Sequence, residues 1–447
     1  MRPDELRFSE IVSALSYALD LTEGQVLGHS ARTALIGMRL AEVLGLTAED
    51  RSALFYALLL KDAGCSSNAA RLCAVFQADD RRLKQDHKRI NWRKTGEAVH
   101  YTVRHAAPGR SVVRRAARVA AIASKPDAVG KELIAIRCER GADIALMLGL
   151  PRATAEAIRS LDEHWDGGGH AVGLSGTGIP LLGRILCLSQ TMEVFAREQG
   201  VDAAFEVVER RAGSWFDPEL VAGLGALRGE GQFWRDALAD DVRNQLEAHE
   251  PEDRVMHADE ARLDRVAEAF AKVIDAKSPF TYRHSERVAL VAVRVAERLG
   301  FDAEALRELR RAALLHDIGK HGVSNLILDK RGPLDDTEWD AMRAHTRFTH
   351  AILDRVAPFR GFAELAASHH ERLDGRGYHR GVGREQLSLA ARVLSVADTC
   401  EALSAERPYR GALPWDEVTG ILGKLRGTGL DESCCDALEE LGEGVLD

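Results

Sequence analysis

The sequence Ala313-Leu-Leu-His-Asp-Ile-Gly-Lys320 decides how the rest of this chain is interpreted. An apolar helical run ends in His316 and Asp317, which can offer a metal ion one imidazole nitrogen and one or two carboxylate oxygens from a single turn. Gly319 permits close backbone approach, and Lys320 adds a fixed positive charge. A single His-Asp pair is usually a surface or capping pair, so its meaning depends on the residues around it.

Helical periodicity dominates on both sides of this stretch. Residues 288–299 carry apolar side chains around most of a helix, and Gly300 follows as a helix-ending glycine should. Leu44-Gly45 and Leu148-Gly149 repeat this ending. Because sustained strand alternation is scarce, the sequence predicts an all-α fold with loops at the glycine clusters.

Composition sets wide bounds on the class of protein. The chain has 447 residues, of which 45% are hydrophobic and 29% charged, so it reads as a globular protein of two or three domains. No apolar run reaches the roughly 18–20 residues of a membrane span, and the start lacks a signal-peptide core. Seven cysteines without a Cys-x-x-Cys motif favour reduced thiols and a cytoplasmic location. The net charge of −9 makes nucleic acid an unexpected partner.

Four segments of the chain occur twice. Residues 28–46 match 283–301, 61–64 match 316–319, 162–169 match 370–377, and 184–191 match 392–399. The spacings agree as well, since His29 to Lys61 and His284 to His316 are both 32 residues. We therefore interpret the chain as two homologous helical domains, residues 1–246 and 259–447, joined by a polar linker at 247–258.

The two copies differ by an insertion in the first one. Lys61 to Arg137 spans 76 residues where His316 to His345 spans 29, which places about 47 extra residues around 71–120. Residues 71–118 hold 13 Lys/Arg against 4 Asp/Glu. A solvated helical pair is the favoured interpretation because aromatic residues are sparse. The alternatives are a surface that binds nucleic acid, a segment that covers the second copy, and a basic surface that attracts an anionic ligand.

The second copy concentrates histidine, with eight of the sixteen between His284 and His379. The candidate metal ligands are His284, His316, Asp317, His345, His369, His370 and Asp398. Singly, each has a structural alternative: a helix start for His284, a surface position for His345, a helix cap for Asp398. Together, five histidines and two carboxylates exceed the needs of one ion and fit two. Two adjacent cations can generate a hydroxide at neutral pH and clamp a phosphoryl centre.

The chain resembles the HD-GYP family, metal-dependent phosphodiesterases of the HD superfamily that hydrolyse cyclic di-GMP. The motifs are the His-Asp stretch above, His369-His-Glu-Arg-Leu-Asp-Gly-Arg-Gly-Tyr378, Ala391-Arg-Val-Leu-Ser-Val-Ala-Asp398 and Arg407-Pro-Tyr-Arg410. The resemblance covers 263–441, and a degenerate similarity covers 28–227. It implies two tandem HD-type helical bundles. It also implies hydrolysis of a cyclic dinucleotide, with cyclic di-GMP as the favoured substrate, by a hydroxide that bridges two ions of iron or manganese.

The resemblance also implies residue roles. All seven candidates would be metal ligands with Asp317 bridging, and Lys320 would contact the substrate phosphate. Asp374, Arg376, Gly377 and Tyr378 would form a substrate-side loop that also meets a signalling partner. Three departures matter. His379 replaces a proline, which should loosen this loop. Phe280, one turn before His284, replaces the glutamate of a third metal, so two metals are expected. Thr346 and Thr349 replace Pro and Gly, with only local effects expected.

The first copy is predicted to be metal-free. Its matching positions are His29, Lys61, Asp62, Arg137, Leu161, Asp162 and Gln190. Lys61 and Arg137 put positive charges where a cation should bind. This copy would either pair with the active one within the chain or keep a regulatory nucleotide pocket. For the second copy, the alternatives to a cyclic-dinucleotide phosphodiesterase are a phosphohydrolase of another nucleotide, a di-iron oxygenase, and a sensor or scaffold that binds the dinucleotide without catalysis.

Overall fold

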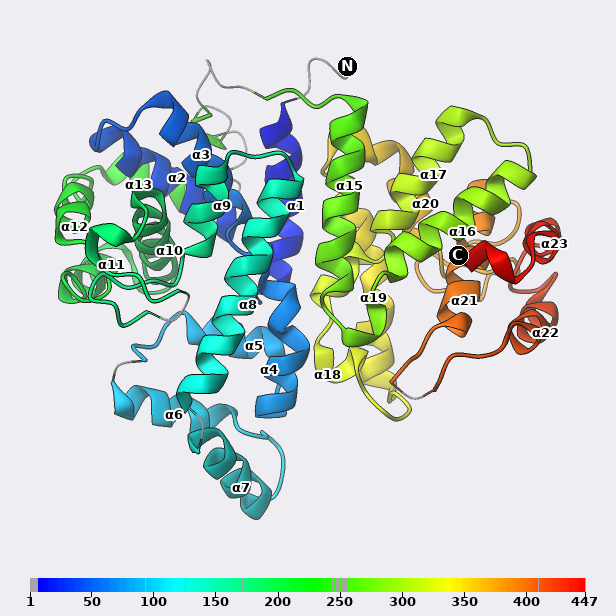
Figure 1. Ribbon diagram of the computed structural model, residues 1–447, viewed down its shortest axis with the longest axis horizontal. Coiled ribbons are helices and arrows are strands. Elements are labelled where there is room, and N and C mark those ends of the chain that lie inside the picture. Colours follow the sequence, from blue (N-terminus) through cyan, green and yellow to red (C-terminus); the bar gives the residue numbers. More distant parts are fainter. Residues whose placement is uncertain are drawn as a thin grey trace. The chain divides into compact units, whose positions relative to one another are not determined.

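The computed structural model (Figure 1) describes residues 7–92, 94–124, 126–169, 172–240, 242, 245–246, 249–250, 256–408 and 410–446, with side chains except at 126–130. Within these ranges every regular element is a helix, and extended pairing is limited to isolated β-bridges. The all-α prediction is confirmed. None of the helices in this part of the chain combines the length and the apolar character needed to span a membrane. All seven cysteines are free thiols.

The chain divides into two compact units, residues 1–259 (unit 1) and 260–447 (unit 2). The α-helices of unit 1 are α1 (Phe8–Thr22), α2 (His29–Val43), α3 (Ala48–Leu60), α4 (Ala69–Phe76), α5 (Asp80–His87), α6 (Thr95–His105), α7 (Val112–Ala123), α8 (Pro126–Met147), α9 (Arg152–Arg159), α10 (Leu181–Gln199), α11 (Val201–Arg210), α12 (Pro218–Gly225) and α13 (Gly231–Ala237). Those of unit 2 are α15 (Glu260–Asp275), α16 (His284–Arg298), α17 (Ala303–Leu315), α18 (Asn325–Leu328), α19 (Asp336–Leu353), α20 (Arg360–Ala367), α21 (Leu389–Ser404), α22 (Trp415–Leu425) and α23 (Glu432–Leu441).

The segment predicted to be a linker, 247–258, is only partly described, since 247–248 and 251–255 lie outside the described residues. Glu250 is buried and accepts hydrogen bonds from the hydroxyls of Ser9 and Tyr56, at 2.7 and 2.6 Å. The backbone nitrogen of Phe8 donates to the carbonyl of Met256. These described residues are therefore packed onto unit 1.

Several helices begin or end at residues that the sequence marks as caps, such as glycine at the end and Asp or Glu at the start. Gly45, Gly149 and Gly300, which were predicted to end helices, have φ of 66°, 74° and 82°, values that suit a residue without a Cβ. In unit 2, α19 begins with a capping box in which Asp335 and Glu338 each accept from the other's backbone nitrogen. These ends fix where α16 and α19 start and stop, and both helices carry residues of the candidate site.

A close backbone contact holds the His-Asp turn of unit 2 against α19. A Cβ on Gly319, in the 3-10 helix η6 (Ile318–Gly322), would lie 1.9 Å from the carbonyl oxygen of His345. The hydroxyl of Thr349 donates to the carbonyl of His316 at 2.8 Å and accepts from the Gly319 nitrogen at 3.0 Å. The Thr346 hydroxyl lies 3.0 Å from the Tyr378 carbonyl oxygen. Each of these threonines therefore joins α19 to another segment of unit 2.

The same contacts recur in unit 1. A Cβ on Gly64 would lie 1.9 Å from the carbonyl oxygen of Arg137. The ring of His29 contacts the carboxylate of Glu193 as that of His284 contacts Glu401. The Ser30 hydroxyl donates to Asp20 at 2.8 Å, and the Ser285 hydroxyl donates to Asp275 at 2.7 Å. This recurrence supports the interpretation of the chain as two copies of one fold.

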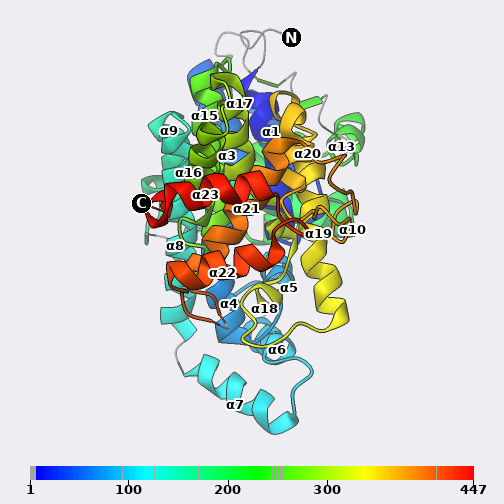
Figure 2. The ribbon, with the colours of Figure 1, turned by 90° about the vertical axis from the view of Figure 1, so that its right-hand side faces the viewer.

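The inserted segment differs from the predicted solvated helical pair, because residues 69–123 form the four helices α4 to α7. Phe76, Ala78, Leu83 and Tyr101 form a small core between them. The rings of Trp92 and Tyr101 contact edge to face, with centroids 5.0 Å apart. Figures 1 and 2 both place α6 and α7 at one end of unit 1. The few aromatic residues of the insertion therefore lie together inside it.

In unit 1, a buried network of charges lies at the position that corresponds to the metal site predicted for unit 2. Lys88, which follows α5, has its ammonium nitrogen 2.9 Å from Glu23 Oε2, 3.3 Å from Asp62 Oδ1 and 3.5 Å from His29 Nε2. Lys61 also pairs with Asp62. Burial disfavours the charged ammonium, but the carboxylates of Asp62 and Glu23 outweigh it and raise the pKa of Lys88. A cation that belongs to the chain thus stands among these ligand-type side chains.

We expect Lys88→Met to lower the free energy of unfolding of unit 1 by about 3–5 kcal/mol, because Glu23 and Asp62 stay buried with less compensation. The matched control is Lys94→Met, which removes an exposed pair with Glu97 at 3.1 Å and should change stability by at most about 1 kcal/mol. Denaturant unfolding of the full chain at neutral pH measures both.

The deficit of Lys88→Met should also depend on pH. Despite burial, the neighbouring ammonium groups hold the pKa of Glu23 at about 2, below its usual 4.5. A depressed carboxyl pKa contributes stability that is fully present above pH 4.5 and is lost as the pH falls toward 2. The difference between wild type and Lys88→Met should therefore shrink below pH 4.5. Equal effects of the two lysine substitutions would contradict a stabilising role of the network.

Candidate metal centre

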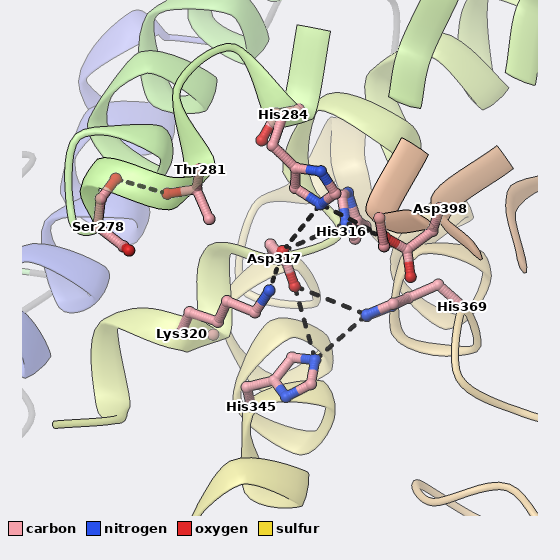
Figure 3. A network of polar contacts seen from close by, with 12 residues as sticks. Ser278, Thr281, His284, His316, Asp317, Lys320, His345, His369 and Asp398 are labelled. Atoms are coloured by element: carbon pink, nitrogen blue, oxygen red, sulfur yellow. Dashed lines mark hydrogen bonds and ion pairs between the residues drawn. The ribbon is translucent and has the colours of Figure 1, made fainter. Parts of the chain in front are cut away.

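The structure brings the seven predicted ligand residues of unit 2 into one cluster (Figure 3). His284 begins α16, His316 and Asp317 follow α17, His345 lies within α19, His369 and His370 follow α20, and Asp398 lies within α21. His345 is 1% exposed and Asp398 is 7% exposed. The alternatives of a surface position for His345 and a helix cap for Asp398 are therefore wrong.

Asp317 lies at the middle of the cluster. Its Oδ2 is 3.3 Å from His316 Nε2 and 3.5 Å from His284 Nε2, and its Oδ1 is 3.6 Å from His345 Nε2 and 3.7 Å from His369 Nε2. Each carboxylate oxygen thus faces a different pair of imidazoles.

Asp398 and His370 complete the two halves. Asp398 Oδ1 is 3.4 Å from His284 Nε2 and 3.7 Å from His316 Nε2, while Oδ2 is 3.8 Å from His370 Nδ1. Two groups result, each compact enough for one ion: His284, His316 and Asp398 form one, and His345, His369 and His370 form the other.

Backbone carbonyls fix the tautomers of three of these histidines. The Nδ1 atoms of His316, His345 and His369 lie 2.6, 2.6 and 2.7 Å from the carbonyl oxygens three residues earlier. A carbonyl only accepts, so Nδ1 carries the hydrogen and Nε2 presents a lone pair in the neutral ring. The Nε2 atoms of His345 and His369 are 3.2 Å apart, which brings two lone pairs face to face.

The residues present fit a pair of divalent cations. His316 Nε2 and Asp317 Oδ1 are buried and make no hydrogen bond, and a buried acceptor without a partner costs about 1–3 kcal/mol. Facing lone pairs add repulsion. A cation between them removes both penalties, and imidazole with carboxylate suits iron, manganese and zinc.

Two of the histidines and the central carboxylate have the protonation states that metal ligands need. Burial lowers the pKa of His345 to about 3 and that of His370 to about 4, so both rings are neutral at pH 7. Burial alone would raise the pKa of Asp317, but Lys320 and His316 outweigh it and hold that pKa well below its usual range. His345 and His370 are therefore neutral and Asp317 is ionised. For His284, burial favours the neutral ring, but contacts with Asp317, Asp398 and Glu401 outweigh it and raise the pKa well above its usual value.

The residues predicted to contact a substrate occupy different positions relative to the ligand cluster. Lys320 Nζ is 2.5 Å from Asp317 Oδ2, with its side chain 20% exposed, so it joins the cluster to solvent. The ring of Tyr378 packs on that of His370, with centroids 4.6 Å apart. A Cβ on Gly377 would lie 2.4 Å from the Glu371 Cα, so only glycine fits there. The Arg343 guanidinium lies over the Tyr378 ring, 5.9 Å from its centroid.

Asp374 and Arg376 are exposed on the same loop. The carboxylate of Asp374 accepts from the guanidinium of Arg372 at 2.9 Å and from the Arg376 nitrogen at 3.0 Å. The contacts of Asp374 therefore shape the loop's turn and are not directed at the cluster. Tyr409 of the Arg-Pro-Tyr-Arg motif lies outside the described residues.

Two expectations about the surroundings need correction. The loop around His379 was expected to be loose, but Glu371 Oε1 accepts from the nitrogens of Arg380 and Gly381, at 2.6 and 3.1 Å, and ties it down. Phe280 was placed one turn before His284 in the same helix, but it lies in the separate 3-10 helix η5 (Pro279–Thr281).

Sequence reasoning missed Glu401. Its carboxylate accepts from Nδ1 of His284, and Arg407 and Arg287 lie 3.2 and 3.8 Å from it. Glu401 follows Asp398 by one helical turn in α21, so both face the cluster. A signal was present, because the repeated segments could have been extended to the equivalent Glu193, three residues after Gln190.

Unit 1 keeps the frame of this centre without its chemistry. Arg137 pairs with Asp162, and Lys61 and Lys88 pair with Asp62. Glu23, Asp62 and Cys65 are close enough to hold an ion, but the lysine ammonium groups already meet both carboxylates.

Comparison with known proteins places the chain. The HD domain family model matches residues 131–220 and 268–434. The 3'3'-cGAMP-specific phosphodiesterase 3 of Vibrio cholerae is 41% identical over 432 residues, covering 97% of this chain and 94% of that protein. A cyclic di-GMP phosphodiesterase of Thermotoga maritima is 36% identical over 169 residues, covering 37% of this chain and 46% of that protein.

The fold is shared with a solved structure as well. A crystal structure of a cyclic GMP-AMP specific phosphodiesterase of Vibrio cholerae matches with a TM-score of 0.66 and 38% sequence identity, covering 97% of each chain. With this likeness over nearly its whole length, the chain belongs to the HD-domain family, in the HD-GYP branch of phosphohydrolases.

Proposed function

We propose that this chain is a metal-dependent phosphodiesterase that hydrolyses a cyclic dinucleotide at the centre of unit 2. The observation that carries the proposal is the convergence of imidazole lone pairs and Asp317 oxygens on two adjacent positions, with buried acceptors left unsatisfied. Two divalent ions, iron or manganese, would be held there by His284, His316 and Asp398 and by His345, His369 and His370, with Asp317 shared. When bound, the ions supply Lewis-acid activation of water and of the phosphoryl group.

The side chains of the centre divide the remaining work. Lys320 lies between buried Asp317 and solvent, so its ammonium can pair with a non-bridging phosphate oxygen and stabilise the charge that develops there. Tyr378 forms a wall beside His370 that can orient the substrate. No side chain needs to become a covalent nucleophile.

For the substrate we favour 3'3'-cGAMP over cyclic di-GMP, which reverses the order expected from sequence. A relative that aligns with 97% of this chain is named for 3'3'-cGAMP, whereas the Thermotoga enzyme named for cyclic di-GMP aligns with 37% of this chain. Cyclic di-GMP is the second candidate, since the two dinucleotides share the phosphodiester that the centre would attack.

The test begins with metal analysis of anaerobically purified protein and turnover of both dinucleotides with added Mn²⁺ or Fe²⁺. We expect about two ions per chain and faster hydrolysis of 3'3'-cGAMP. His284→Gln should weaken metal binding by more than about 100-fold. Loss of a residue that binds the metal directly should cost more than loss of a hydrogen-bond partner of such a residue, which costs about 10–100-fold.

The matched control for that substitution is His29→Gln at the equivalent position of unit 1, which should leave metal content and turnover unchanged. Binding of either dinucleotide without hydrolysis by the metal-loaded protein would refute the enzyme in favour of a sensor. Oxygen consumption by the reduced iron form without phosphodiester cleavage would favour an oxygenase.

Glu401 provides a separate test of how the centre is positioned. Glu401→Gln removes the negative charge behind His284, so we expect metal affinity to fall by about 10–100-fold and turnover to be rescued by raising the metal concentration. Metal titrations followed by activity at saturation measure both effects. Glu193→Gln in unit 1 is the control and should leave metal affinity unchanged. A rate loss that excess metal does not restore would contradict this role.

A further inference from the structure

We propose that unit 1 holds a binding site for a small amphiphilic anion, a molecule with one acidic group on a compact apolar body. The site is a cavity of about 460 Å³ enclosed by the inserted helices and α8. This inference goes beyond the phosphodiesterase function, and it neither uses nor needs the metal centre of unit 2.

The walls of the cavity are mainly apolar. They include Leu72 and Val75 of α4, Val99 of α6, Val119 and Ile122 of α7, and Leu133 of α8. Protein interiors are close-packed, and apolar voids of this size are rare in them. A volume of about 460 Å³ instead lies within the roughly 300–1,000 Å³ range of small-molecule sites, which are lined mostly by apolar side chains.

One wall of the cavity is held in place without being part of a packed core. Helix α7 has no buried residue, and Val119 and Ile122 remain partly exposed although they face the cavity. Ile122 packs in part against the small core of the insertion, and part of the apolar surface of both side chains stays uncovered. A ligand with an apolar body would cover that surface and gain about 25 cal/mol per Å² removed from water.

The polar end of the cavity carries positive charge. Lys84, Lys88 and Arg137 line it, against Glu23 as the acidic group among the lining residues. Lys88 already contacts Glu23 and Asp62, and Arg137 pairs with Asp162. The cations are therefore held in fixed positions by carboxylates, and three cationic side chains face one carboxylate among the residues that line the cavity.

Three polar atoms at the cavity lack partners. The atoms that are buried and make no hydrogen bond are Trp92 Nε1, Arg137 Nε and Asn68 Oδ1. The Asn68 side chain belongs to a residue that is 6% exposed. Its Nδ2 donates to the carbonyl of Leu133 at 3.2 Å, so the orphaned oxygen faces elsewhere. The two unpaired donors, Trp92 Nε1 and Arg137 Nε, match an anionic head group, which accepts through its oxygens.

The same walls exclude other occupants. A cyclic dinucleotide has two phosphates and two polar bases, and the apolar lining would leave most of those groups unpaired. The expectation of a regulatory nucleotide pocket in this copy therefore finds no support here. A metal ion is disfavoured because the ammonium of Lys88 already occupies the centre of the carboxylate cluster.

The test uses the full chain without added metal and two anionic probes. Fluorescence titration with 1-anilinonaphthalene-8-sulfonate reports an aromatic body, and its displacement by decanoate reports an aliphatic one. We expect one saturable site per chain for the fluorescent probe. Competition by decanoate would assign an aliphatic ligand, and displacement by 1-naphthoate alone would assign an aromatic one.

A matched pair of substitutions on α7 locates the site. Val119→Trp should weaken probe binding by about tenfold or more. The indole ring would occupy space that the probe needs, and close-packed neighbours leave little room to move aside. Val113→Trp adds the same ring on the same helix at a position 79% exposed and away from the cavity, so binding should be unchanged. Equal affinities of these two variants would overturn the assignment, as would displacement of the probe by 3'3'-cGAMP.

A third variant tests the charge of the ligand without changing the volume of the cavity much. Trp92→Phe keeps an aromatic ring and removes the unpaired donor, so decanoate should bind about tenfold more weakly, the effect of losing a hydrogen bond to a charged group. The neutral analogue decanol should lose less affinity, because a hydrogen bond to an uncharged oxygen contributes less than one to a charged oxygen. If decanol binds wild type as tightly as decanoate does, the anionic class is wrong.

Discussion

The centre of unit 2 depends on one hydrogen bond made three times, from a histidine Nδ1 to the carbonyl three residues before it. Two of these carbonyls stand at helix ends: α17 ends just before His316 and α20 ends two residues before His369. The last carbonyls of a helix have no partner within it, so each ring satisfies one and is aimed by it. The same helix ends carry partial negative charge. Breaking two helices at these histidines therefore directs lone pairs and a favourable field to one point.

Unit 1 shows what this frame becomes when the cation is built into the chain. Asp62 and His29 persist there, but their persistence is no trace of metal binding, because Asp62 now compensates Lys61 and Lys88. In unit 2 the carboxylate Asp317 is buried with one oxygen unsatisfied. Both arrangements obey the same requirement, that a buried carboxylate must meet positive charge. Unit 1 meets it with buried lysines at both Asp62 oxygens, whereas in unit 2 Lys320 meets Asp317 Oδ2 and leaves Oδ1 without a hydrogen bond.

Sequence predicted the helical class, the paired segments and the cluster of seven residues, because each left a pattern: periodicity, repetition, or histidine at fixed spacing. What it missed left weaker patterns. Lys88 lies in a basic insertion with no counterpart in the other copy, where a lysine normally faces water. Glu401 is an ordinary helix residue until His284 is placed against it. The link from Thr349 to His316 depends on a backbone approach that only the folded chain reveals. Sequence therefore named the groups that carry the chemistry more readily than those that hold them.

The insertion joins two properties of unit 1 that would otherwise appear separate. Lys84 and Lys88 pair with Glu23 beside Asp62, at the position that corresponds to the centre of unit 2, and both also line the cavity. The helices that bring these lysines, α4 to α7, supply the apolar walls as well. A floor of fixed ammonium groups, unlike a pair of exchangeable ions, needs no water or phosphate to complete its contacts. It can therefore border a dry, apolar cavity, which a hydrated metal centre could not. The same insertion that places ammonium groups among the carboxylates of unit 1 thus also supplies the walls of the proposed binding site.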